Sequence, residues 1–146
     1  MTNSLKCIPL EKKIELPVFE NQQLGMSIGM ALNSDIIPIS IFPRWNFLIC
    51  ATDQLVNHLD KIILMSNGQY KPKVIIRTSV GAERPIHPQH QHIGNMTNGY
   101  RLMCPNIEFI ELYETEDIFP AYQRAYERTD GKSTVLVEFG DFLAEK

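Results

Sequence analysis

Residues 15–32 read ELPVFENQQLGMSIGMAL, and this stretch predicts a passage from strand to helix. The apolar run before Glu20 fits a short strand, which we place at residues 14–19. The residues after Glu20 follow a helical pattern, which predicts a helix over 21–33. The residues alone leave two interpretations of Glu20 open. It is either a helix-start acid, which stabilises the helix by about 0.3 to 1 kcal/mol, or a working acid/base group.

Farther along the chain, β-type runs alternate with longer helical patterns. The predicted strands span residues 36–42, 73–79, 107–112 and 133–139. One predicted helix runs from an Asn46 cap to about residue 66, and another spans 115–129 with a Thr cap. Residues 80–95 have the composition of a loop. This alternation predicts an α/β fold with three layers, in which a mainly parallel sheet carries helices on both faces.

The length of 146 residues fits one domain. Residues 1–13 are mixed and polar, and we expect them to form an N-terminal arm. Residues 14–146 are then expected to form a single α/β domain.

The composition excludes several classes of function. The net charge is -3 and the pI about 5.8, so no basic field attracts nucleic acid or anionic lipid. No apolar run reaches the roughly 18 to 20 residues that cross a bilayer. The three cysteines share no metal-ligand spacing. We therefore expect a cytoplasmic protein with reduced thiols.

The predicted parallel sheet selects the places where function is expected. Ligands of such sheets bind at the carboxyl ends of the strands. In this sequence that rule selects Glu20 after the first strand, residues 42–47 after the second, and the 80–95 loop after the third.

An ordered series of residues carries a resemblance to a known family. Pro17 precedes Glu20, and Gly25 and Gly29 follow it five and nine residues later. The series continues with Pro38, Phe42, Trp45, Asn46, Phe47, Asp53, Gln54, Lys61, Met65, Ser66, Gly68, Arg77, Gly81, Gln89, His90 and Glu138. In this order the residues resemble the pyrimidine-binding domain of thiamine-diphosphate (transketolase-like) enzymes. They are most similar to the beta subunit of the decarboxylase component of 2-oxoacid dehydrogenases.

The resemblance implies a role for each candidate site residue. In that family a glutamate hydrogen-bonds a ring nitrogen of the cofactor's aminopyrimidine, which helps to deprotonate the thiazolium carbon that attacks a 2-oxoacid. The resemblance gives this role to Glu20, and it gives His90 the handling of protons near the substrate carbonyl. An aromatic side chain packs on the pyrimidine, for which Phe47 is the first choice and Phe42 and Trp45 are its neighbours. A place for Trp45 in the core is an equal alternative.

The resemblance also implies a partner. The family's diphosphate and magnesium site lies in a separate domain, so thiamine diphosphate would be shared with a partner chain that holds the magnesium. We therefore expect a homo- or hetero-oligomer that acts on a small 2-oxoacid. Gly25 and Gly29, four residues apart, either admit the backbone of another chain or serve packing inside the domain.

Three positions depart from the family pattern. Phe19 stands where the family has a small hydroxyl residue, Gln22 where it has glycine, and Ile41 where it has glutamate. These departures favour an alternative, a non-catalytic relative that keeps the fold as an interaction or regulatory module. The glutamate at position 20 favours an enzyme subunit.

A histidine cluster offers a further, weaker candidate. His87, His90 and His92 have the spacing H-x2-H-x-H in one predicted loop. Imidazole suits zinc or nickel, but no acid or thiol stands nearby in the sequence to complete a ligand set. We therefore predict no metal site in this chain, and we expect histidines that adjoin a catalytic loop.

Overall fold

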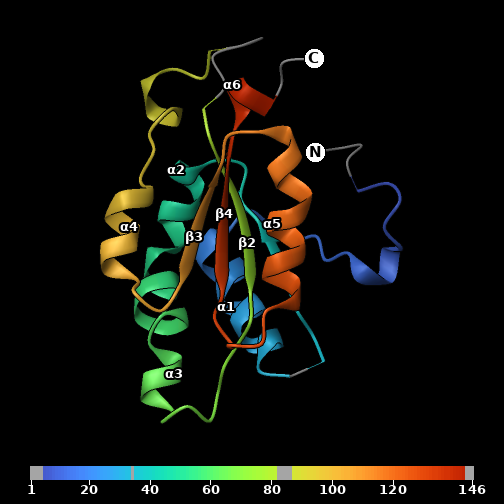
Figure 1. Cartoon of the computed structure of the whole chain (residues 1–146), viewed down its shortest axis with the longest axis vertical. Helices are drawn as coiled ribbons and strands as arrows, with labels where there is room; N and C mark the ends of the chain where they lie inside the picture. The colour runs from blue at the N-terminus through green and yellow to red at the C-terminus, as the bar shows by residue number, and fades with distance from the viewer. Residues whose placement is uncertain (1–4, 34, 82–86, 144–146) are drawn as a thin grey trace.

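A parallel sheet forms the centre of the computed structural model, which describes residues 5–33, 35–81 and 87–143 (Figure 1). Its four strands within the described residues are β1 (Ile39–Ile41), β2 (Ile75–Val80), β3 (Glu108–Leu112) and β4 (Thr134–Phe139). Their order across the sheet is β1-β2-β4-β3, and each neighbouring pair is parallel. The carboxyl ends of the strands therefore meet at one edge of the sheet.

The two central strands share the longest register in the sheet. β2 reads IIRTSV and β4 reads TVLVEF, both rich in the β-branched residues that favour strands. They are paired over their full length, from Ile75 opposite Thr134 to Val80 opposite Phe139. Val135, Leu136 and Val137 are successive buried residues, as expected of a parallel strand covered on both faces.

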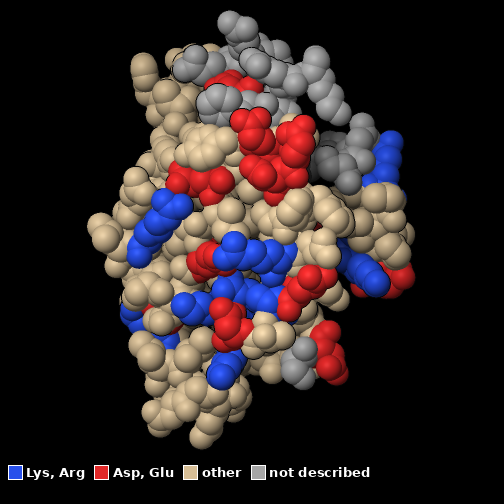
Figure 2. Space-filling model, viewed as in Figure 1, with Lys and Arg blue, Asp and Glu red and all other residues tan. Residues whose placement is uncertain are grey.

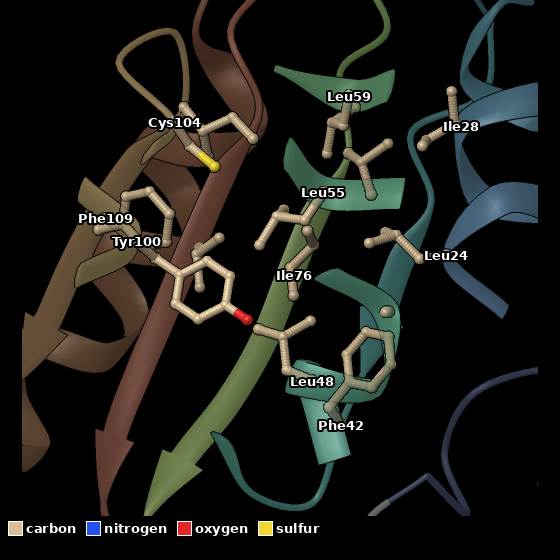
Figure 3. Packing of buried hydrophobic residues seen from close by; sticks show 14 of the residues in the cluster. Leu24, Ile28, Phe42, Leu48, Leu55, Leu59, Ile76, Tyr100, Cys104 and Phe109 are labelled. Atoms are coloured by element: carbon tan, nitrogen blue, oxygen red, sulfur yellow. The ribbon is translucent and has the colours of Figure 1, made fainter. Parts of the chain in front are cut away.

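One face of the sheet carries most of the helices. They are α1 (Glu20–Ala31), α2 (Trp45–Leu48), α3 (Ile62–Met65) and α4 (Thr97–Met103). A 3-10 turn (Ile49–Ala51) and a π-helical segment (Gln54–Leu59) connect α2 to α3. The larger hydrophobic core lies between these elements and the sheet, with Leu24, Leu55 and Ile76 at its centre (Figure 3).

The opposite face is covered by α5 (Thr115–Glu127), which packs Ala121 and Ala125 against Leu136. Two short 3-10 turns (Leu10–Lys12 and His90–His92) and α6 (Gly140–Leu143) complete the described elements. With helices on both faces of a parallel sheet, the predicted three-layer α/β fold is confirmed.

The predicted strand at residues 14–19 is wrong. These residues are irregular up to α1, which begins at Glu20, and β1 lies at the border of the sheet with β2 as its neighbour. An apolar run becomes a strand only where a neighbour accepts its backbone hydrogen bonds. Here no backbone hydrogen bond joins the run to β1, and Val18 is 92% exposed.

The predicted helix starts also need correction. Arg44, not Asn46, precedes the first turn of α2, and no side chain caps that turn. Glu114 takes the corresponding position before α5, so Thr115 is the first helical residue and not the cap. The predicted strand at 36–42 is shorter, at Ile39–Ile41, and the predicted 80–95 loop contains residues 82–86, which lie outside the described residues.

In the described ranges, no helix combines the length and the apolar character that crossing a bilayer requires.

Candidate functional site

Glu20 is the first residue of α1 and lies at the carboxyl edge of the sheet. One turn later, the Gln23 side-chain amide donates to Ser40 Oγ and to the Ile41 carbonyl, both at 3.0 Å. These two bonds fix the first turn of α1 to the end of β1. Glu20 is partly exposed, and the described residues provide no hydrogen bond that occupies its carboxylate. Its carboxylate is thus available at the edge where ligands of parallel sheets bind.

The two glycines of α1 have different surroundings. A Cβ at Gly25 would meet Gln54 Oε1 at 3.2 Å, so this glycine lets α1 approach the π-helical segment closely. The Gln54 amide also donates to Asn21 Oδ1 at 3.3 Å. Around Gly29, no atom of the described residues outside the backbone of α1 lies within 4 Å of an added Cβ. Gly25 therefore serves packing inside the domain, and the side of α1 at Gly29 is open.

Two of the three candidate aromatic residues are core residues. Phe42 and Trp45 are both 0% exposed (Phe42 is drawn in Figure 3). The Trp45 ring stacks on Tyr100, with ring centroids 5.0 Å apart, and on Phe109 at 6.3 Å. The core alternative for Trp45 is therefore the observed one, and neither ring has surface to offer a ligand.

Phe47 is the partly exposed member of the three. Its ring stacks on His92, with the centroids 5.4 Å apart and the planes inclined by 18°. Arg44, just before α2, donates from Nη1 to the His92 carbonyl at 3.3 Å. These contacts join α2 to the 3-10 turn His90–His92, two segments that are more than 40 residues apart in the sequence.

His90 lies in the same turn but is exposed. Its ring meets the edge of the His87 ring, with the centroids 6.4 Å apart. Within the described ranges, no three His, Cys, Asp or Glu side chains are grouped so that they could hold a metal ion. The structure thus brings Phe47 together with His92, while His90 is paired with His87.

Sequence reasoning missed Arg44 and gave no separate role to His92. Arg44 stands two residues beyond Phe42, at the end of β1, and this position is the signal that could have identified it. Two buried polar atoms of this region, Asn46 Oδ1 and His92 Nδ1, lack a hydrogen-bond partner among the described residues. Buried polar atoms of this kind usually find their partner in an ordered water or in a bound ligand.

The α5 side of the molecule carries charges of both signs. Figure 2 shows basic and acidic side chains interleaved across this view. The described ion pairs here include Arg128 with Glu108 at 2.8 Å and Arg128 with Asp130 at 2.7 Å. Glu116 and Asp117 lie in the first turn of α5, next to the carboxyl edge of the sheet. These acids would repel a diphosphate, so the α5 side of the edge disfavours the charged end of a nucleotide-like cofactor.

Comparison with known proteins gives a consistent set of relatives, although no family model matches the chain. The beta subunit of the pyruvate dehydrogenase E1 component of Rickettsia conorii is 31% identical over 107 residues, which are 73% of this chain and 32% of that protein. The mitochondrial subunits of Drosophila melanogaster and Homo sapiens are 26% and 28% identical, over 73% and 71% of this chain and 28% of each protein.

The chain therefore spans about 28% to 32% of the length of these curated relatives. The similarity nonetheless extends over nearly three quarters of the chain, together with a parallel α/β sheet. The resemblance inferred from the sequence is confirmed: this chain is similar to beta subunits of the pyruvate dehydrogenase E1 component.

Proposed function

We propose that this chain supplies the pyrimidine-binding half of a thiamine-diphosphate-dependent 2-oxoacid dehydrogenase or decarboxylase site. In this proposal Glu20 accepts or shares a proton with a ring nitrogen of the aminopyrimidine. The observation that carries the proposal is the place of Glu20: it begins α1, at the carboxyl edge of the sheet, and the Gln23 bonds to β1 hold that turn.

The residues at this edge fit the pyrimidine end of the cofactor. Phe47 offers a partly exposed aromatic ring, against which a planar heterocycle packs well. Asn46 Oδ1 and His92 Nδ1 are polar atoms of the same region that lack partners among the described residues. Phe42 and Trp45, proposed from the resemblance as neighbours of Phe47, are buried in the core and do not serve as ligand contacts.

When it is bound, the cofactor supplies the electron sink for decarboxylation, and the chain supplies orientation and proton handling. Glu20 would hold the proton at the ring nitrogen, and Phe47 would fix the plane of the ring. The resemblance assigns protons near the substrate carbonyl to His90. Because His90 is exposed and its described ring contact is His87, this assignment has the weakest support of the three.

The proposal includes a partner chain that binds the diphosphate through magnesium, in a homo- or hetero-oligomer. Glu116 and Asp117 in the first turn of α5 support a diphosphate site on the partner chain. Their negative charges disfavour a diphosphate on the α5 side of the carboxyl edge of the sheet. A cytoplasmic location also stays a prediction, and the printed names of some relatives place those proteins in mitochondria.

The test is co-expression with a chain that carries the diphosphate-binding domain, followed by titration with thiamine diphosphate and Mg²⁺. Glu20→Gln should lower turnover of a 2-oxoacid by about 10²- to 10⁴-fold, the usual range for a lost acid/base group. Glu15→Gln, the same change at an exposed glutamate nearby, serves as the matched control and should leave turnover unchanged. Equal turnover of wild type and Glu20→Gln would overturn the assignment.

The second candidate function is a non-catalytic interaction or regulatory module. Val18 and Phe19, two adjoining exposed residues directly before Glu20, favour it, because contiguous exposed apolar surface marks contacts with other proteins. A complex that forms with the partner chain but neither binds the cofactor nor turns over a 2-oxoacid would establish this second function.

A further inference from the structure

We propose that the outer edge of β1 is an interaction surface, and that its partner is a second copy of this chain. Residues 14–19 of the second copy add to β1 as an antiparallel strand, and the exchange is mutual. The proposal concerns the association of two chains, so it depends neither on Glu20 nor on a bound cofactor.

The backbone of β1 has unused hydrogen-bonding groups at its outer edge. Phe42, directly after β1, donates its backbone N–H to the Arg77 carbonyl of β2 at 2.8 Å. Successive residues of a strand turn their backbone groups to opposite sides, so Ile41 and Ile39 face away from β2. Among the described residues, the Gln23 amide bonds the Ile41 carbonyl at 3.0 Å, and no bond occupies either N–H or the Ile39 carbonyl. Such an edge binds an extended segment through its main chain.

The Ile39 side chain adds apolar surface to this edge. Ile39 is in register with Ile75, which belongs to the buried cluster under α5, so both side chains point to the α5 face of the sheet. Ile75 is buried between its neighbours, whereas Ile39 is 54% exposed at the border of the sheet. A further strand with apolar side chains on the α5 face would cover Ile39.

Residues 14–19 have the pattern that this edge requires. In IELPVF, the apolar Ile14, Leu16 and Val18 stand at alternate positions and so lie on one face of an extended segment. Ile14 and Val18 are exposed, and Figure 1 shows the N-terminal segment, in blue, outside the sheet. Pro17 has no N–H to donate, so it faces away from a neighbouring strand. The three apolar residues are therefore the ones that pair.

The direction of pairing follows from the face that needs cover. In an antiparallel pair, residues that exchange hydrogen bonds lie opposite each other with their side chains on the same face. Bonded to Ile39 and Ile41 in this way, Ile14, Leu16 and Val18 lie on the α5 face. In a parallel pair, the bonding residues of the two strands point to opposite faces, so the same three side chains would leave Ile39 uncovered.

The antiparallel direction identifies the source of the strand as another copy. In one chain, residues 14–19 end at the carboxyl edge of the sheet, where α1 begins, and α1 leads back to the start of β1. A crossover of this kind joins parallel strands only. A second copy has no such connection, and two-fold symmetry lets each chain donate its segment and accept that of the other.

The test measures the dimer dissociation constant of the full chain by analytical ultracentrifugation. Ile39→Pro removes an outward N–H, and proline is tolerated on an edge strand where that group faces solvent. We expect the dissociation constant to rise about 10-fold, through the lost hydrogen bond and the bulk of the ring. Ile39→Val, the matched control, keeps the N–H and should associate like wild type. Circular dichroism checks that each variant is folded.

A second pair of variants tests the donated segment, which lies outside the regular structure. Val18→Pro removes an N–H that pairs and should weaken the dimer about 10-fold, whereas Glu15→Pro changes a position that faces away and should not. Hydrogen exchange should show the Ile39 amide becoming protected as the protein concentration rises.

Three outcomes would overturn the proposal. One is a wild type that stays monomeric at every concentration, and another is a dimer that Ile39→Pro and Val18→Pro leave unchanged, since a different surface then joins the copies. The third is protection of the Ile39 amide only after a chain with the diphosphate-binding domain is added, which would assign the edge to that chain.

Discussion

Arg77 of β2 and Glu138 of β4 are paired across the two central strands, where Arg77 Nε donates to Glu138 Oε2 at 2.8 Å. The Tyr122 hydroxyl of α5 donates to the other carboxylate oxygen at 3.0 Å. Burial, followed by the Glu138 charge, raises the pKa of the Tyr122 phenol, so it stays a donor at all ordinary pH values. A single carboxylate therefore connects β2, β4 and α5 near the carboxyl edge of the sheet.

Replacing Arg77 should destabilise the fold because its partner Glu138 is only 16% exposed. Arg77→Met leaves that carboxylate without its charged donor, and we expect a loss of about 2 kcal/mol in the free energy of unfolding. Arg124→Met is the control, since this arginine is 68% exposed and its ion pair with Glu108 should contribute about 0.5 kcal/mol. Urea unfolding of both variants measures the difference, and equal losses would contradict the stated role of Arg77.

Gly131 is required by the backbone between α5 and β4. Its φ is +74°, and a Cβ there would lie 2.8 Å from Lys71 Cβ. We expect Gly131→Ala to lower the free energy of unfolding by about 1 to 3 kcal/mol.

Gly29→Ala should act in the opposite direction. This glycine lies inside α1, and among the described residues no atom outside the helix backbone lies within 4 Å of an added Cβ. Alanine therefore gains helix propensity of about 0.5 to 1 kcal/mol without a clash. Thermal unfolding monitored by circular dichroism should show the two melting temperatures shifted to opposite sides of wild type. If both variants shifted the melting temperature in the same direction, the surroundings described for Gly131 or for Gly29 would be wrong.

Asp60 is a fully buried carboxylate between the π-helical segment and α3. It accepts from the Asn106 backbone N–H at 2.8 Å and from Lys61 Nζ at 2.5 Å, and so fixes the turn before β3. Asp60→Ala leaves the Asn106 N–H without its acceptor, and a loss of about 2 to 4 kcal/mol is expected.

Asp53→Ala, in the same helical span, is the comparison for Asp60. Asp53 is 56% exposed, and its partners His58 and Asn57 are close neighbours in sequence, so the expected loss is about 0.5 kcal/mol or less. Denaturant unfolding of the two variants gives the ranking. Stability equal to wild type in Asp60→Ala would contradict a structural role for this carboxylate.

Cys104 should make the protein less stable at alkaline pH. Burial, with a contribution from Asp60, raises the pKa of its thiol from 9.0 to about 12. Between these values the unfolded chain loses the thiol proton while the folded chain keeps it, so the free energy of unfolding falls as the pH rises from about 9 to 12. Cys104→Ala should reduce this fall, as measured by urea unfolding at pH 8 and at about pH 10.

A thiol reagent provides an independent measurement. Cys7 and Cys50 are exposed and should react with Ellman's reagent in the folded protein, whereas the buried Cys104 should react only after unfolding. Immediate reaction of all three thiols under native conditions would contradict the burial of Cys104.

Three of the strands could be predicted from the sequence because their local pattern and their surroundings agree. Residues 73–79, 107–112 and 133–139 contain β-branched and other apolar residues, and each is paired in the sheet. The run at residues 14–19 has a similar local pattern but no strand beside it, which a linear pattern does not reveal. Helix α4 was not predicted, because its seven residues bury only Thr97 and Tyr100 and so show no helical apolar stripe.

The sequence predicted the helix that begins near Glu20 but not how this residue reaches the sheet. Glu20 lies at the sheet edge because the Gln23 amide binds the end of β1, and not because a strand at residues 14–19 ends there. Trp45 and Phe47 both looked suitable for a ligand, but the helix starts at Trp45. Side chains two positions apart on a helix point roughly 200° away from each other around the helix axis. Because Trp45 is buried, Phe47 is turned toward the surface. The contact between Phe47 and His92 could not be predicted, because it depends on the path of a long loop.

The bonds of the Gln23 amide also affect the order of folding. They join residues only 17 and 18 positions apart, whereas the Arg77–Glu138 pair joins residues 61 positions apart. Short loops close with a smaller entropy loss and usually form first. The corner of the molecule that carries Glu20 can therefore assemble as an early local unit, while the pairing of β4 with β2 requires the closure of a much longer loop.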